Sequence, residues 1–342
     1  MTFRLLVSLS MLVAAPAAAA GPKPLFETND PIHITIRGPI KTLVQTRSTT
    51  PVAGTLTTPT GESLPIALSV RGITRRKSEI CDFPPLRVEF TRPPPPTSLF
   101  AGQRRLKLST HCNNSASYQQ YALLEYAAYR MYNVVTPLSF RVRLANVDYV
   151  QDDGRPVISR VGFFIEDADD IAKRNGLREL HAPSLIPVAT LSPVDSARYA
   201  IFEHMIANHD WSMRANVQGE DCCHNSKLVG RGGLGPGEAM PIPYDFDFSG
   251  LVSAPYAGPP PDFGIATVRD RYFRGYCAHA AQFGPVAAQF RAARPQILAA
   301  LASTPQLDEK NLRRASAFVD QFFAKIATDR DVAANLVKRC IN

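Results

Sequence analysis

Residues 31–110 alternate hydrophobic and polar positions in short runs separated by turn-forming residues. Successive side chains of a β-strand point to opposite faces, so this alternation predicts strands with one buried face. Glycine, proline and threonine stand between the runs, which is typical of the turns between strands. The proline-rich segment 92–98 is expected to be a surface connector. The expected strands are 32–38, 52–58, 63–72, 86–90 and 104–110.

The hydrophobic period then changes. Residues 116–135 place apolar side chains three to four positions apart, which predicts an amphipathic helix. An antiparallel strand pair is expected around the turn at 151–155. Further along, we expect a short helix at 169–176, a helix at 196–211, strands at 226–230 and 240–248 joined by a flexible glycine-rich loop at 230–237, and mostly helices over 280–340.

These elements divide the chain into a leader and two parts. Residues 1–20 contain one basic residue, an apolar stretch and a run of alanines, which is typical of a secretory signal peptide cleaved after Ala20. Residues 21–165 are predicted to form a β-rich N-terminal lobe with one helix, and 166–342 a mainly helical C-terminal lobe. The expected fold class is α+β, the expected location is the periplasm or the exterior, and no transmembrane segment is predicted.

Six cysteines in an exported chain favour disulfide bonds, but six allow fifteen pairings and the sequence does not select one. Cys222 and Cys223 are adjacent, and neighbouring residues are poorly placed to pair with each other. We therefore expect at least one of them to bond to a distant segment. A zinc site built from residues 222–224 with His111 and Cys112 is the alternative, although it lacks the usual ligand spacing.

The net charge of +8 is moderate for 342 residues. Basic clusters at 74–77 and 103–107 are interpreted as solvated faces, with a polyanion partner as the alternative. No nucleic-acid motif accompanies them, so no nucleic-acid partner is expected. The oligomeric state stays open.

The segment PIPYDFDFSG, residues 241–250, places Asp245 and Asp247 two positions apart. In a strand both carboxylates would point to one face. Two buried like charges are unfavourable unless a cation or hydrogen-bond donors compensate them. A polar strand end that runs into a turn is the simpler interpretation.

Several motifs occur in an order that resembles the CotH family of secreted atypical kinases, which have a protein-kinase-like fold. The resemblance spans about residues 32–330, and each motif alone is weak. The segments that carry it are LSVRGITRRKSEICDFPPLRVEF, RVGFFIEDADDIAKRNG, ANHDWS, CCHNSKLV and IPYDFDFSG. The resemblance implies a two-lobed protein-kinase-like fold and phosphoryl transfer from ATP, or another nucleotide, to Ser, Thr or Tyr of secreted or envelope proteins.

The resemblance also implies roles for residues of the second part. Asp210 would be the catalytic carboxylate that orients or deprotonates the acceptor hydroxyl. Asn225 and Asp245 would bind Mg²⁺ or Mn²⁺, for which oxygen ligands are suited. Asp247 would be an accessory ligand or would support one.

In the first part the resemblance is weaker. A phosphate-contacting cation is required on a strand, and both Arg87 and Lys107 are candidates, although arginine and lysine are not equivalent there. Glu125, within the apolar run YALLEYAAY, is the candidate partner of that cation, but a structural salt bridge would satisfy it equally. Glu166 is the candidate contact to the nucleotide base.

Two other functions stay open from the sequence. One is a catalytically silent kinase-like scaffold or binding module of the envelope, which the changed basic position favours. The other is a metal-dependent transferase or hydrolase that uses the same carboxylates. The sequence has no nucleophile elbow, HExxH motif or P-loop, so the hydrolase, zincin and P-loop chemistries are disfavoured.

Overall fold

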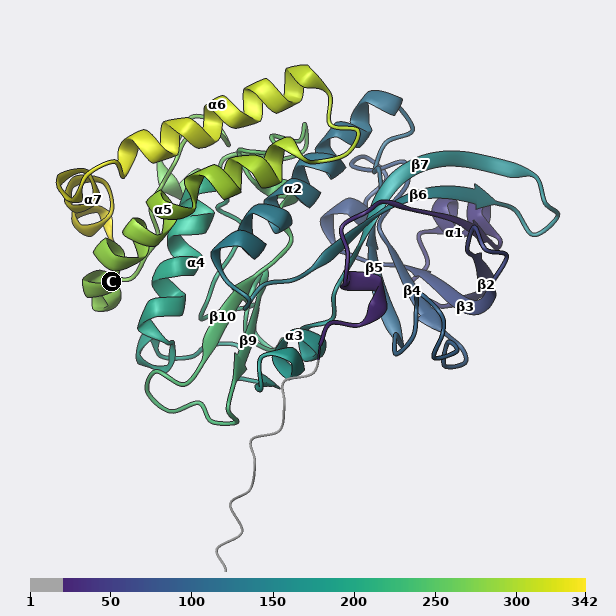
Figure 1. Ribbon diagram of the computed structural model, residues 1–342, viewed down its shortest axis with the longest axis horizontal. Helices are drawn as coiled ribbons and strands as arrows, with labels where there is room; N and C mark the ends of the chain where they lie inside the picture. The colour runs from purple at the N-terminus through teal and green to yellow at the C-terminus, as the bar shows by residue number, and fades with distance from the viewer. Residues whose placement is uncertain (1–20) are drawn as a thin grey trace, which may run out of the picture.

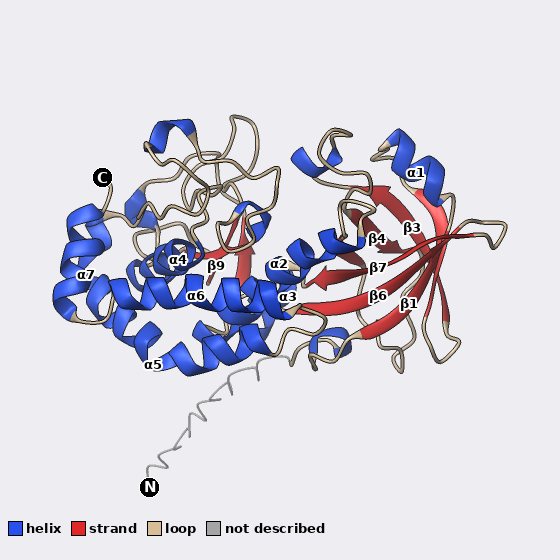
Figure 2. Ribbon diagram, turned by 90° about the horizontal axis from the view of Figure 1, so that it is seen from above, coloured by secondary structure: helices blue, strands red, loops and turns tan. Residues whose placement is uncertain are grey.

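The computed structural model describes residues 21–342, so the expected signal peptide at 1–20 lies outside the described residues. Seven strands form a closed barrel in the order β1, β2, β3, β4, β5, β7, β6. The barrel occupies one end of the molecule and the larger helices the other (Figure 2). The barrel strands are β1 (Ile32–Arg37), β2 (Val52–Thr57), β3 (Ser63–Val70), β4 (Leu86–Phe90), β5 (Arg105–Ser109), β6 (Val142–Val150) and β7 (Pro156–Ile165).

The expected two-lobed protein-kinase-like fold is wrong, because the β-rich part is this closed barrel. Strand β1 pairs antiparallel with β2 on one side and parallel with β6 on the other, where Ile32 is opposite Ala145. These pairings leave the seven-stranded sheet without a free edge, and closure of this kind protects the backbone groups of the edge strands.

The interior of the barrel holds its own hydrophobic core. Strand β1 alternates strictly, with Ile32, Ile34 and Ile36 buried and the residues between them more exposed. The matching side chains of β2, β3 and β4 complete this core, among them Leu56 and Leu68. Alternating burial along β1 and the first part of β4 explains why the period-two pattern identified these strands, whereas β7 buries every residue of 161–165.

Helix α2 (Gln119–Val135) connects the barrel with the helical part (Figure 1). On one side its Tyr126 and Tyr129 rings contact Phe163 of β7 edge-on. On another side it packs along α5, inside a second hydrophobic core. The remaining helices are α1 (Ile40–Thr46), α3 (Ala168–Arg174), α4 (Pro193–Ile206), α5 (Phe283–Ala302), α6 (Glu309–Lys325) and α7 (Asp329–Asn335).

A second sheet has three antiparallel strands, β8 (Arg178–Leu180), β9 (Ser226–Gly230) and β10 (Met240–Pro243), with β9 in the centre. The strand expected over 240–248 ends at Pro243. Asp245 has a left-handed backbone with φ 66°, and a short 3-10 helix, η5 (Phe246–Phe248), follows it. The helix expected at 196–211 ends earlier, at Ile206, because Ala207 is left-handed and closes it.

Three disulfides join Cys81 to Cys112, Cys277 to Cys340 and Cys222 to Cys223. The expectation that Cys222 or Cys223 bonds to a distant segment is therefore wrong, because the two bond to each other. Disulfides persist in oxidising compartments, and these three are consistent with an exported protein. Within residues 21–342, no helix has both the length and the apolarity needed to cross a membrane.

Candidate functional site

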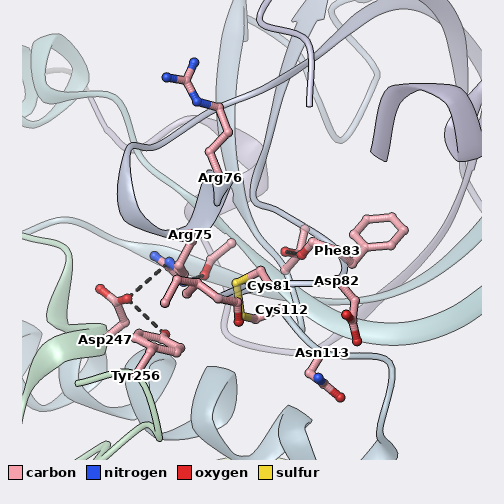
Figure 3. Close-up of a disulfide and its surroundings, with 12 residues drawn as sticks. Arg75, Arg76, Cys81, Asp82, Phe83, Cys112, Asn113, Asp247 and Tyr256 are labelled. Carbon is pink, nitrogen blue, oxygen red and sulfur yellow. Dashed lines mark hydrogen bonds and ion pairs between the residues drawn. A yellow bond between two sulfur atoms is a disulfide. The ribbon is translucent and has the colours of Figure 1, made fainter. Parts of the chain in front are cut away.

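Arg75 lies at the centre of three carboxylates that come from different elements. It belongs to the 3-10 helix η2 (Thr74–Arg76), and its guanidinium contacts Glu125 of α2 at 3.1 Å, Asp245 at 3.0 Å and Asp247 of η5 at 3.2 Å. Figure 3 shows the Asp247 contact and the neighbouring Tyr256. The Arg75 side chain is only 8% exposed. We call these four residues the Arg75 cluster.

Two carboxylates of the Arg75 cluster accept a further hydrogen bond, and the backbone of Asp245 makes one as well. The Ser109 hydroxyl donates to Glu125 Oε2 at 3.0 Å, and the Tyr256 hydroxyl donates to Asp247 Oδ2 at 3.0 Å. The backbone N–H of Asp245 donates to the hydroxyl oxygen of Tyr129 at 2.8 Å. A buried charge needs such partners, since an unpaired one is strongly destabilising.

Burial and charge act in opposite directions on the pKa values of the Arg75 cluster. Burial raises the pKa of Glu125 and of Asp247, and the nearby Arg75 offsets only part of that rise. Burial would also raise the pKa of Asp245, but Arg75, Arg71 and Lys107 outweigh it and hold this pKa below the ordinary value. Asp245 is thus the carboxylate of the cluster that most firmly keeps its negative charge.

Asp210 and Asn225 form a second group beside Asp245. The Asn225 side-chain amide donates to Asp210 Oδ2 at 3.1 Å and to the Asp210 carbonyl at 2.7 Å. His224 Nε2 lies 2.7 Å from Asp210 Oδ1. The backbone N–H of Tyr244 donates to the Asn225 carbonyl at 3.2 Å, which connects this group to the residue before Asp245.

Short local features explain this second group. Helix α4 ends at Ile206, so Asp210 lies in the loop just beyond it, with its N–H bonded to Asn208 Oδ1 at 3.2 Å. Asn225 has a left-handed backbone with φ 48° and directly precedes β9. The hydrogen bond with Asp210 raises the pKa of His224 against the opposing effect of burial.

A cationic group adjoins Asp245 on the barrel side. Burial, followed by the charges of Arg71 and Lys227, lowers the pKa of Lys107 from 10.5 to about 7. The Lys107 ammonium lies 4.7 Å from the centre of the Tyr244 ring. Among the described residues it has no hydrogen bond and no ion pair, so an incoming anion would stabilise its charge.

The structure therefore brings together most of the residues expected from the sequence. Asp210 and Asn225 are bonded to each other, Asp245 and Asp247 share Arg75, and Lys107 lowers the pKa of Asp245. Glu125 also lies in the Arg75 cluster, but its partner is Arg75 and not a strand lysine.

Two residues that the sequence predicted for the site, Arg87 and Glu166, have side chains that lie away from its carboxylates. Arg87 is opposite Lys107 in the barrel, but its side chain is 45% exposed and its nearest carboxylate is Glu89 at 4.0 Å. Glu166 is buried and bonded to Arg174 at 3.0 Å and to the backbone N–H of Arg141 at 2.9 Å. Neither contacts the carboxylates of the candidate site.

Sequence reasoning missed Arg75 as a site residue and considered His224 only in the alternative zinc site at 222–224. Arg75 lies in the basic cluster 74–77, which was interpreted as a solvated face. The sequence did indicate that such a cation exists, because Glu125 lies in an apolar run and a buried carboxylate needs a positively charged partner. It did not indicate which basic residue that partner is.

Comparison with protein-family models finds no match for this chain, and comparison with curated proteins finds none either. The resemblance to the CotH family therefore rests on the sequence motifs and stays a prediction.

Proposed function

We propose that this protein is an exported CotH-like phosphotransferase. It would transfer the terminal phosphoryl group of ATP or another nucleotide to a Ser, Thr or Tyr hydroxyl of a secreted or envelope protein, with Mg²⁺ or Mn²⁺ bound. One observation carries the proposal: Asp210, Asn225 and the chain before Asp245 form one hydrogen-bonded unit, and the Lys107 ammonium lies over the ring of Tyr244, the residue before Asp245. Phosphoryl transfer requires mainly this kind of positioning and charge neutralisation.

Asp210 is the proposed proton acceptor. The bond between the terminal phosphorus and the departing nucleotide oxygen breaks, a bond forms from the acceptor hydroxyl oxygen to phosphorus, and the hydroxyl proton moves to Asp210. Its side chain is 39% exposed, so an acceptor chain can reach it from solvent. Asn225 and His224 each contact one of its oxygens and thereby orient the carboxylate.

The donor atoms at Asn225 and Asp245 fit a divalent ion. The Asn225 Nδ2 is used by Asp210, which leaves its amide oxygen for a cation, and Asp245 contacts Arg75 through Oδ1 alone. Oxygen ligands of this kind suit Mg²⁺ and Mn²⁺. When bound, the ion would neutralise charge on the phosphate oxygens.

Lys107 and Arg71 are the proposed phosphate contacts. The lowered pKa of Lys107 means that its charge is destabilised in the free protein. A phosphate group would stabilise that charge, so part of the unfavourable interaction would be removed on nucleotide binding.

A binding module of the envelope without turnover is the second candidate. The specific observation in its favour is Arg75, which already neutralises charge on Asp245 and Asp247. In that case a nucleotide or partner would bind, and no phosphoryl group would be transferred.

Melting temperature and phosphate transfer, measured together, test the proposal. ATP with Mn²⁺ at about a hundred times the dissociation constant should stabilise the wild type by about 2.7 kcal/mol. Asp245→Ala should abolish this shift. Asp210→Ala should keep the shift but lose about 10²–10⁴-fold in transfer from radiolabelled ATP to protein.

Asp221→Ala is the matched control, because Asp221 is 67% exposed and pairs with His181 away from this unit. It should behave as the wild type does. A cooperative melt without any shift would refute nucleotide binding. A shift without transfer in the wild type would favour the second candidate.

A further inference from the structure

Arg75 contacts its carboxylates in the way that a bound cation would. Glu125, Asp245 and Asp247 each offer an oxygen, and these oxygens all lie within 4.8 Å of one another, which is close enough for one metal ion. The guanidinium instead reaches all three, using Nη1 for Glu125, Nη2 for Asp245 and Nε for Asp247. Arginine keeps its charge at any ordinary pH, so it neutralises this position permanently.

The segment that carries Arg75 is held in place from several sides. Arg47 donates from Nη1 to the Arg76 carbonyl at 3.1 Å and from Nη2 to the Cys81 carbonyl at 2.7 Å. The disulfide between Cys81 and Cys112 ties the end of the segment to the chain that follows β5 (Figure 3). Arg75 also donates to the Ser109 hydroxyl at 3.2 Å. These contacts fix the backbone that follows Arg75 and the direction of its side chain.

The neighbouring arginine provides a contrast. Arg76 points away from Asp247 and Tyr256, whereas Arg75 points toward them (Figure 3). The two residues have the same charge and adjacent positions, so a difference between their variants reports the location of the guanidinium and not the net charge of the segment.

We propose that Arg75 is a built-in cation that takes the place of a divalent ion among Glu125, Asp245 and Asp247. A divalent ion at the proposed site would then bind Asp245 together with Asn225, outside the Arg75 cluster. The inference deepens the proposed function and rests on it for the site of this second ion. The occupation of the three carboxylates by Arg75 does not depend on phosphoryl transfer.

The exposure of the three carboxylates agrees with this arrangement. The side chains of Glu125 and Asp247 are 1% and 6% exposed, whereas that of Asp245 is 28% exposed. An ion that arrives from solvent therefore meets Asp245 first. Both Glu125 oxygens already accept hydrogen bonds, Oε1 from Arg75 and Oε2 from Arg75 and Ser109.

The test counts the Mn²⁺ ions bound per chain, by electron paramagnetic resonance of free Mn²⁺, without nucleotide. The wild type and Arg76→Ala should bind one ion. Arg75→Ala should bind two, because the three carboxylates lose their cation and oxygen ligands of this kind attract Mn²⁺. Arg75→Ala with the same count and affinity as the wild type would overturn the inference.

A second variant keeps the test decisive if Arg75→Ala does not fold, which its circular dichroism would reveal. Glu125→Gln should change the wild-type Mn²⁺ affinity less than about twofold, because Glu125 binds Arg75 and no ion. A loss of more than about tenfold is expected of a group that orients or ligates a metal, and it would overturn the inference.

The same Mn²⁺ counts test the proposed metal site of the phosphotransferase separately from the role of Arg75. A wild type that binds no Mn²⁺, together with an Arg75→Ala chain that binds one, would refute the proposed metal site at Asp245 and Asn225. It would still support Arg75 as the built-in cation. A wild type that binds two ions would overturn the inference and leave the phosphotransferase proposal in place.

Discussion

Replacement of Lys107 by methionine should stabilise the protein in a pH-dependent way. The Lys107 pKa falls from 10.5 to about 7 because burial, Arg71 and Lys227 disfavour its charge, and Asp167 and Asp245 offset this only in part. One pKa unit corresponds to about 1.4 kcal/mol, so the charged lysine destabilises the fold by up to about 5 kcal/mol at neutral pH. Methionine has no charge and can pack on the Tyr244 ring.

The direction of the pH effect follows from which state holds the proton. Between pH 7 and pH 10.5 the unfolded chain keeps Lys107 protonated while the folded chain releases the proton, so wild-type stability rises with pH. Lys107→Met lacks this contribution. Its advantage in unfolding free energy over the wild type should therefore shrink by about 2 kcal/mol between pH 7 and pH 9.

Urea unfolding of both proteins at the two pH values measures this difference, and contributions from groups that do not interact with Lys107 cancel between them. The described residues contain no free cysteine, so thiol exchange does not complicate the measurement at pH 9. An advantage that does not change with pH would refute the lowered pKa. Lys107→Met should also bind ATP more weakly, if Lys107 contacts phosphate as proposed.

Two further changes test the packing around the site. Phe246 is fully buried against Tyr129 and lies between the two aspartates in the chain. In urea unfolding, Phe246→Ala should lower the free energy of unfolding by about 3–5 kcal/mol, and Phe246→Leu by roughly half as much or less. Equal losses for the two variants would contradict this packing. Replacement of both Cys277 and Cys340 by alanine removes a disulfide that spans 63 residues. The free energy of unfolding in urea should fall by about 4 kcal/mol. An unchanged unfolding midpoint would show that this disulfide contributes no stability.

The local elements were predictable from the spacing of their apolar residues. Helix α2 lies where that spacing placed a helix, but it is not amphipathic as expected, because every residue of 122–129 is buried. Strand β1 buries every second residue, and this alternation identified it from the sequence. Barrel closure was not predictable in this way. It depends on the pairing of β1 with β6, which are more than a hundred residues apart, and an alternating strand carries no information about its neighbours.

The same limit applies to the site. The spacing of Asp245 and Asp247 suggested a shared cation, and the structure gives them one, but on a turn and a 3-10 helix instead of a strand. Arg75 is 170 residues away from Asp245 along the chain. Its immediate neighbours, Thr74 and Arg76, are polar and basic, so local sequence does not distinguish it from the half-buried Arg76.

The position of Arg75 has a consequence for how the barrel and the helical part act together. Its guanidinium joins η2, which follows barrel strand β3, to α2 and to the turn after β10. Removal of one partner from a buried ion cluster typically costs about 3–5 kcal/mol, so these elements are strongly held in one arrangement. Asp245 belongs to this cluster and is also linked, through Tyr244, to Asn225 and Asp210. A displacement of η2 would therefore move Asp245, and through the Tyr244–Asn225 and Asn225–Asp210 hydrogen bonds it would change the position of the proposed catalytic carboxylate, Asp210. Replacement of Arg75 should therefore change the stability of the fold and the geometry of the site together.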